Sequence, residues 1–173
     1  MTCSCLLFGA NPIEKLKAAQ GSTIAAWGAC VEEEIMTREA RLMSGTILIT
    51  VPTIQYGGYF LLTSLMNKSG GYMENPLRQN FFRAGHAHAG GIVILSLVCQ
   101  ILSDAAVSSH PLLWFVRIGV SLSAILISVG FFFSVLPPTA TQASGAVSLI
   151  YAGALILALA VVTLGIGLLR HPI

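Results

Sequence analysis

Long apolar stretches separated by short polar breaks make up most of the chain after residue 41. Each stretch holds about 20 mostly apolar residues, which is the length that a helix needs to cross ~30 Å of hydrocarbon. None of them contains an acidic residue, and they run over residues 42–66, 84–102, 112–136 and 144–169. The pattern predicts an all-α protein, built as a four-transmembrane-helix bundle.

The breaks between the predicted spans are short and rich in residues that end helices. They cover residues 67–76, 110–111 and 137–138, and each contains proline. Short connections predict that sequential spans pack antiparallel. One base, Arg117, falls well inside a span, and its side chain can snorkel back to the interface. On that side of the membrane it pairs most simply with Asp104.

Composition supports a membrane location and excludes several other classes. Of the 173 residues, 55% are hydrophobic and only 9% are charged, whereas about 25% charged residues is typical of soluble domains. Disorder is excluded, because it needs low hydrophobicity and high net charge. The net charge of +2 is too small for a nucleic-acid binder. The lipid bilayer is therefore the expected partner, and nucleic acid is not.

The first 41 residues are predicted to form a separate amphipathic helical extension before the transmembrane domain of residues 42–173. Ile24, Trp27, Val31 and Ile35 recur at helical spacing, beside three glutamates at 32–34. Helices that lie on membranes usually carry Lys and Arg on their polar face. The acidic face therefore favours docking on protein.

Basic residues near the spans indicate the orientation in the membrane. The side that holds both predicted termini carries Arg38, Arg41 and Arg170, with Lys15 and Lys17 further away and Arg117 directed toward it, and the other side carries Lys68, Arg78 and Arg83. We favour cytoplasmic termini in a bacterial inner membrane.

Two histidines, His86 and His88, open the second predicted span. Ionisable residues inside a membrane are candidates for function, and imidazole is a common ligand of metals and haem iron. In a helix, positions two apart point about 200° away from each other. Both side chains would reach one ion only if the first turn is irregular, which Gly85 and the glycines at 90–91 allow.

Three interpretations of the histidines stay open. His88 lies deeper than His86 and has small residues one turn before and after it, which suits a haem or a chlorophyll-type tetrapyrrole. Copper is possible with Met66 and Met73, which lie on the same side of the membrane. Alternatively, both histidines bind loop carbonyls where small residues let two helices approach closely.

A polar seam is predicted near the midplane of the first span, formed by Pro52, Gln55, Tyr56 and Tyr59. Proline kinks a helix, and interrupted helices often line transporter sites. Gln55 is expected to point inward, because an amide is costly in hydrocarbon. Its partner would be a polar residue of a neighbouring span, such as Ser96, Gln100 or Ser128. A kinked packing helix is the alternative to a transport site.

The segment Phe81–Gly90, together with residues 75–80 and the upstream run 51–58, resembles a group of small bacterial four-helix integral membrane proteins with an FRAGHAHAG-type segment, themselves uncharacterised. The resemblance spans about Met36 to the C-terminus and implies the membrane class but no activity. A second similarity, of about ten residues, is to the His-x-His at a helix start in relatives of haem-copper oxidases. Their other ligand histidines have no counterpart in these spans.

No catalytic constellation is visible, since the spans hold no nucleophile–base pair, phosphate loop or carboxylate pair. The favoured function is a non-catalytic subunit of a larger membrane assembly or a homo-oligomer. The alternative is a haem-, chlorophyll- or copper-binding protein of an electron-transfer system that uses His86 or His88. A small transporter is the second alternative.

Overall fold

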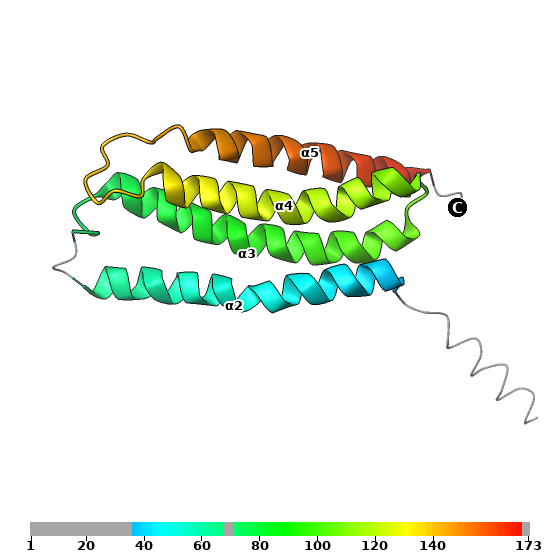
Figure 1. The fold of residues 1–173 in the computed structure, drawn as a ribbon, viewed down its shortest axis with the longest axis horizontal. Coiled ribbons are helices and arrows are strands. Elements are labelled where there is room, and N and C mark those ends of the chain that lie inside the picture. The colour runs from blue at the N-terminus through cyan, green and yellow to red at the C-terminus, as the bar shows by residue number, and fades with distance from the viewer. Residues whose placement is uncertain (1–35, 68–70, 171–173) are drawn as a thin grey trace, which may run out of the picture. The chain divides into compact units, whose positions relative to one another are not determined.

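The computed structural model describes residues 36–67 and 71–170. In that part of the chain the secondary structure is helical, without strands (Figure 1), and comprises α2 (Arg38–Met66), α3 (Pro76–Ala105), α4 (His110–Ser134) and α5 (Val147–Leu169). The all-α prediction is confirmed. Residues 1–35 of the predicted extension lie outside the described residues, and α2 begins at Arg38, four residues before the predicted span.

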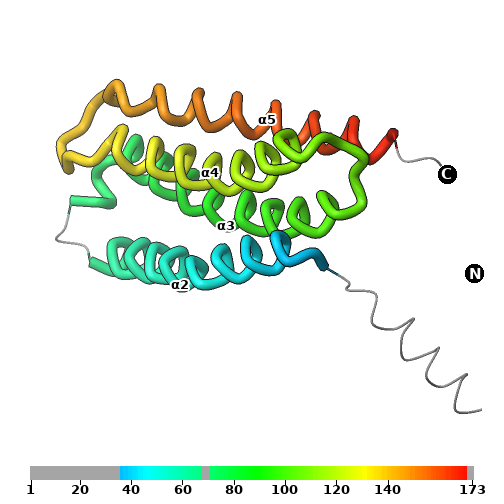
Figure 2. The backbone as a smooth tube through the Cα atoms, turned by 45° about the vertical axis from the view of Figure 1, so that its right-hand side comes forward, coloured from blue at the N-terminus to red at the C-terminus, as the bar shows by residue number. Residues whose placement is uncertain are grey.

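Sequential helices are neighbours, as predicted, and α3 is the central one. It packs against α2, α4 and α5, and α4 also packs extensively against α5. Figures 1 and 2 both show α2 at one side of this bundle and α5 at the other. Substantial packing of α2 within the described residues is therefore with α3 alone, and much of its surface stays uncovered.

Side-chain caps set the starts of α2 and α3. The Thr37 hydroxyl accepts a hydrogen bond from the Ala40 amide at 3.2 Å. Asn75 caps α3 in the same way, accepting from the Arg78 amide at 3.0 Å, and Pro76 occupies the first turn. The Asn75 side-chain amide also donates to the carbonyls of Pro138 and Ala140, at 3.0 and 2.9 Å. One residue thus begins α3 and holds the α4–α5 connection.

The main hydrophobic core lies among α3, α4 and α5, and consists of Ile92, Cys99, Val116, Val120, Ala124, Ile127, Ala160 and Leu164. Two glycines bring α4 and α5 together. A Cβ atom on Gly130 would lie 2.7 Å from Ile150 Cγ1 and 2.9 Å from the Ile150 amide nitrogen. A Cβ atom on Gly153 would lie 2.7 Å from Ile127 Cγ1. The close packing of α4 against α5 therefore requires a residue without a side chain at both positions.

A second core cluster joins α2, α3 and α4 near the end of α2. Leu61, Tyr72, Phe82 and Val135 are buried there. Tyr72 belongs to the loop between α2 and α3, and burial raises the pKa of its phenol above the ordinary value, against the opposing charges of Arg83 and Arg78. The phenol therefore stays neutral at physiological pH.

The outer faces of α3, α4 and α5 are apolar, and α2 exposes apolar side chains beside its polar ones. Large hydrophobic side chains are exposed along each one, for example Ile49, Ile94, Ile125 and Leu155. Soluble monomers rarely expose such a continuous apolar surface. Among the described helices, α3, α4 and α5 are long and apolar enough to cross a membrane, which indicates an integral membrane protein. α2, which corresponds to the first predicted span, is not apolar enough by the same criterion. Pro52, Gln55 and the neighbouring tyrosines and glycines lower its hydropathy.

Candidate functional site

The histidine segment lies within a continuous helix. α3 runs without interruption from Pro76 to Ala105, so the irregular first turn that would bring both imidazoles to one ion is absent. His86 and His88 therefore contact different surroundings, as regular helix geometry predicts. In the described residues, no group of three or more His, Cys, Asp or Glu side chains is placed to hold a metal ion.

His86 packs against the glycine pair of α2. A Cβ atom on Gly58 would lie 3.2 Å from His86 Cε1 and 3.3 Å from its Nε2, and one on Gly57 would lie 3.6 Å from Nδ1. The ring is half-buried at this contact. Because Gly57 and Gly58 have no side chains, the imidazole of His86 on α3 fits against α2 at this point.

His88 is exposed, and its ring is oriented by the backbone of its own helix. Its Nδ1 lies 2.7 Å from the Ala84 carbonyl oxygen. A carbonyl only accepts, so Nδ1 carries the proton and neutral His88 has a free lone pair on Nε2. The ring also lies 5.1 Å from the Phe131 ring, at an interplanar angle of 30°. This arrangement holds the imidazole with Nε2 available to a ligand.

The methionines predicted as copper ligands are both on the surface. Met66, the last residue of α2, is 74% exposed, and Met73 in the following loop is 49% exposed. Neither belongs to a buried core cluster. A metal site of His86, His88, Met66 and Met73 stays a prediction.

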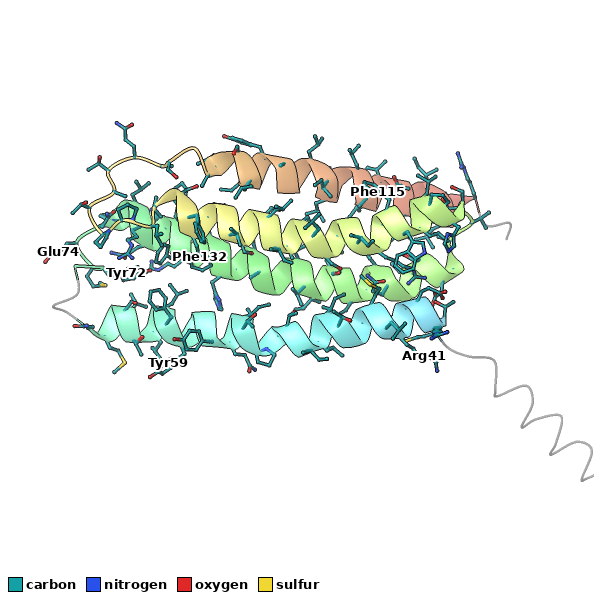
Figure 3. The ribbon with its side chains drawn as sticks, in the orientation of Figure 1. Arg41, Tyr59, Tyr72, Glu74, Phe115 and Phe132 are labelled. Atoms are coloured by element: carbon teal, nitrogen blue, oxygen red, sulfur yellow. The ribbon has the colours of Figure 1, made fainter. Side chains whose placement is uncertain are left out.

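The polar seam of α2 faces outward, so the prediction that Gln55 points inward is wrong. Gln55 and Pro52 are exposed, and Tyr56 and Tyr59 are 70% and 62% exposed. Tyr59 lies at the outer edge of α2 in Figure 3. The reason is that α2 packs mainly on α3, which covers one face of it. A substrate-lining role for the seam stays a prediction.

The polar groups predicted as partners of Gln55 are engaged elsewhere or lack a partner. Gln100 Nε2 donates to the Arg117 carbonyl at 3.0 Å. Ser96 and Ser121 are hydrogen-bonded at 2.7 Å. Ser128 Oγ is buried without a partner among the described residues.

A buried ion pair joins three helices at the end where α2 begins. Arg117 of α4 pairs with Asp104 of α3, as predicted. Its side chain is only 6% exposed, and it reaches toward the end of the bundle where Asp104 lies. Arg117 Nη1 also donates to Gln100, to the carbonyl oxygen at 3.1 Å and to Oε1 at 3.2 Å. The arginine is solvated by protein in place of water.

Thr37 adds α2 to this network. Its hydroxyl donates to Asp104 Oδ1 at 2.7 Å, and its backbone amide donates to Oδ2 at 3.0 Å. The same hydroxyl caps α2. A cavity of about 210 Å³ beside the network is lined in part by His110 and Trp114, and the indole nitrogen of Trp114 donates to His110 Nε2 at 3.1 Å. Thr37 was not predicted from the sequence, although a cap followed by a helical stretch could have indicated it. Gln100 was predicted as a partner of Gln55 and bonds to Arg117 instead.

No family model, curated protein or solved structure matches the chain. The candidate function therefore rests on the arrangement of the helices and their side chains.

Proposed function

We propose that the chain is a four-span membrane protein that acts as a non-catalytic subunit, joined to a second protein chain through the outer face of α2. That chain is either another subunit or a second copy. The observation that carries the proposal is the exposed polar surface of α2, which consists of Gln55, Tyr56 and Tyr59.

The packing of α2 on α3 supports a fourth span. The two helices are in contact from the Thr37–Asp104 hydrogen bonds at one end to the Phe60 and Phe82 rings, 6.1 Å apart, at the other. The 29 residues of α2 extend about 44 Å, enough to cross a bilayer. A helix held along its length against a spanning neighbour lies at the same depth. Four spans bring both ends of the domain to one side, and the excess of basic residues on that side favours the cytoplasm.

The Gln55 side chain indicates what covers α2. It is exposed near the middle of the helix, and no hydrogen bond to its amide is found within the described residues. A primary amide facing hydrocarbon without partners costs several kcal/mol. Across a helix interface the same amide finds donors and acceptors and holds two chains together. A second protein at this face therefore fits the chemistry better than lipid.

A photo-crosslinking amino acid at Tyr59 is expected to give a covalent adduct with protein in native membranes. The matched control is the same replacement at Tyr151 of α5, which is 72% exposed against 62% for Tyr59. Tyr59 lies seven residues before the end of α2, and Tyr151 lies four residues after the start of α5. Figure 1 shows these two helix ends at the same end of the bundle, so the two positions have similar depth and the same side chain.

The size of the adduct distinguishes a second copy from another subunit. A protein adduct from Tyr59 and lipid adducts from Tyr151 would support the proposal. Only lipid adducts from both positions would contradict it.

The geometry of His88 favours a second candidate function, in which His88 Nε2 binds a tetrapyrrole iron or magnesium, or copper. Metal-bound histidines usually donate their other nitrogen to a carbonyl or carboxylate, which orients the ring. His88 already has this arrangement with the Ala84 carbonyl. The exposed ring and the small residues around it leave room for a flat ligand.

Replacing His88 with alanine is then expected to abolish the visible absorbance or the bound copper of protein purified from its native membrane. His86→Ala should retain most of it, because His86 faces Gly57 and Gly58 and does not face the ligand. Absorbance spectra and metal analysis provide the measurement. Colourless, metal-free native protein would exclude this second function and leave the subunit proposal standing.

A further inference from the structure

A groove of about 400 Å³ opens between α2 and α4, with α3 as its floor. It exists because α2 packs mainly on α3 and leaves the adjoining side of α4 uncovered. Ala89, Val93 and Ser96 form the floor, so small side chains make the groove deep there. Its volume lies in the range of small-molecule sites, and no charged side chain is among the described residues that line it.

The hydroxyl groups along the groove are mostly committed to the protein. Thr46, Thr50 and Thr53 of α2 donate to carbonyls of their own helix, at 2.9, 2.6 and 2.7 Å. Ser121 donates to the Arg117 carbonyl, so in its hydrogen bond with Ser96 it is the acceptor. These five groups have no proton left for a ligand.

Ser128 differs from the other buried serines. It is 9% exposed and its Oγ has no hydrogen-bond partner in the part of the chain described. Ser103, Ser123 and Ser134 are also buried, and each donates to a carbonyl of its own helix. A buried hydroxyl without a partner costs about 1–3 kcal/mol. Ser128 is among the residues that line the groove. Its hydroxyl is covered in the present rotamer, and rotation about the Cα–Cβ bond would turn its proton toward an acceptor there.

The depth of Ser128 restricts the class of ligand. It lies six residues, about 9 Å, before the end of α4. The 25-residue helix is about 37 Å long, and it exceeds a ~30 Å hydrocarbon layer by about 4 Å at each end. Ser128 is therefore about 5 Å inside the hydrocarbon. The ester carbonyl of a phospholipid stays at the interface with its headgroup and does not reach this depth.

We propose that the groove binds a lipid-soluble molecule with a neutral carbonyl and no charged headgroup, whose carbonyl oxygen accepts a hydrogen bond from Ser128. Membrane quinones have this chemistry. The uncharged lining matches a neutral head, and the apolar walls match the remainder of the molecule. The inference rests on the proposed membrane location of α2, α3 and α4, but it does not depend on the outer face of α2.

Radiolabelled decylubiquinone provides the probe, measured on the full chain in nanodiscs with empty nanodiscs subtracted. We expect saturable binding of one molecule per chain, weakened about three- to tenfold in Ser128→Ala, the size of one hydrogen bond. The matched control is Ser123→Ala, because Ser123 is buried in the same helix but bonded to the Val120 carbonyl. It should bind as the wild type does.

A second pair of variants tests the location. Ala89→Leu fills the floor of the groove and should abolish binding, whereas Ala87→Leu, at an exposed position of the same helix, should not. Decylbenzene, which lacks the carbonyl, should displace the quinone only weakly. Absent binding, equal affinity in Ser128→Ala, or displacement by phosphatidylglycerol would overturn the inference. The Tyr59 crosslink reports on another face, so either proposal can fail alone.

Discussion

Asp104→Asn is expected to lower the free energy of unfolding by about 3 kcal/mol or more, the largest effect of any single polar substitution proposed for this chain. The change leaves Arg117 charged and 6% exposed, opposite a neutral amide. A buried charge that loses its partner typically costs 3–5 kcal/mol. Two hydrogen bonds from Thr37 to the carboxylate are weakened as well. Denaturation in detergent, followed by circular dichroism, measures the loss.

The control for this substitution is Glu74→Gln, which makes the same chemical change at an exposed loop position and should alter stability by less than about 0.5 kcal/mol. Arg117→Met added to Asp104→Asn should restore part of the stability, because no unpaired charge then remains. Equal stability of the two single variants would contradict the role of the ion pair.

Gly130→Ala is expected to destabilise the protein by about 1–3 kcal/mol through overpacking between α4 and α5. The added methyl group would meet Ile150 Cγ1 at 2.7 Å and the Ile150 backbone nitrogen at 2.9 Å. Backbone cannot rotate away, so the two helices must separate. The normal preference of helices for alanine over glycine, up to about 1 kcal/mol, is too small to compensate.

Gly165→Ala is the matched control, because Gly165 is also in a helix of this pair but has nothing within 4 Å of the added atom. It should be neutral or slightly stabilising. The same unfolding measurement applies to both variants. If the Gly130→Ala protein is as stable as Gly165→Ala, the contact between Gly130 and Ile150 is not tightly packed and the prediction is contradicted.

Residues 84–134 illustrate how far the sequence predicts this fold. Apolar length and proline placement predicted the helices of this region, with α3 starting eight residues earlier than its span because Asn75 caps it there. The pairing of Asp104 with Arg117 was also predictable, since few other opposite charges lie near those helix ends. Periodicity and charge are local properties, and they suffice for these features.

Gln55 and His86 show why the rest could not be predicted. The inward prediction for Gln55 assumed that other helices surround α2, but the number of neighbours of a helix depends on the packing of the whole bundle. His86 was singled out from the sequence, yet its contact with the glycine pair at 57–58 depends on the vertical register of α2 against α3. No pattern within either helix encodes that register.

The two sets of hydrogen bonds that Asn75 forms imply an order of events during biosynthesis. Its side-chain oxygen needs only the amide of Arg78, which leaves the ribosome moments later. Its side-chain nitrogen needs the carbonyls of Pro138 and Ala140, which are made more than sixty residues later, after α4. The Asn75–Arg78 hydrogen bond can therefore cap the start of α3 while the translocon still holds this helix. The bonds from Asn75 to Pro138 and Ala140 form only when the α4–α5 connection has emerged on the same side of the membrane.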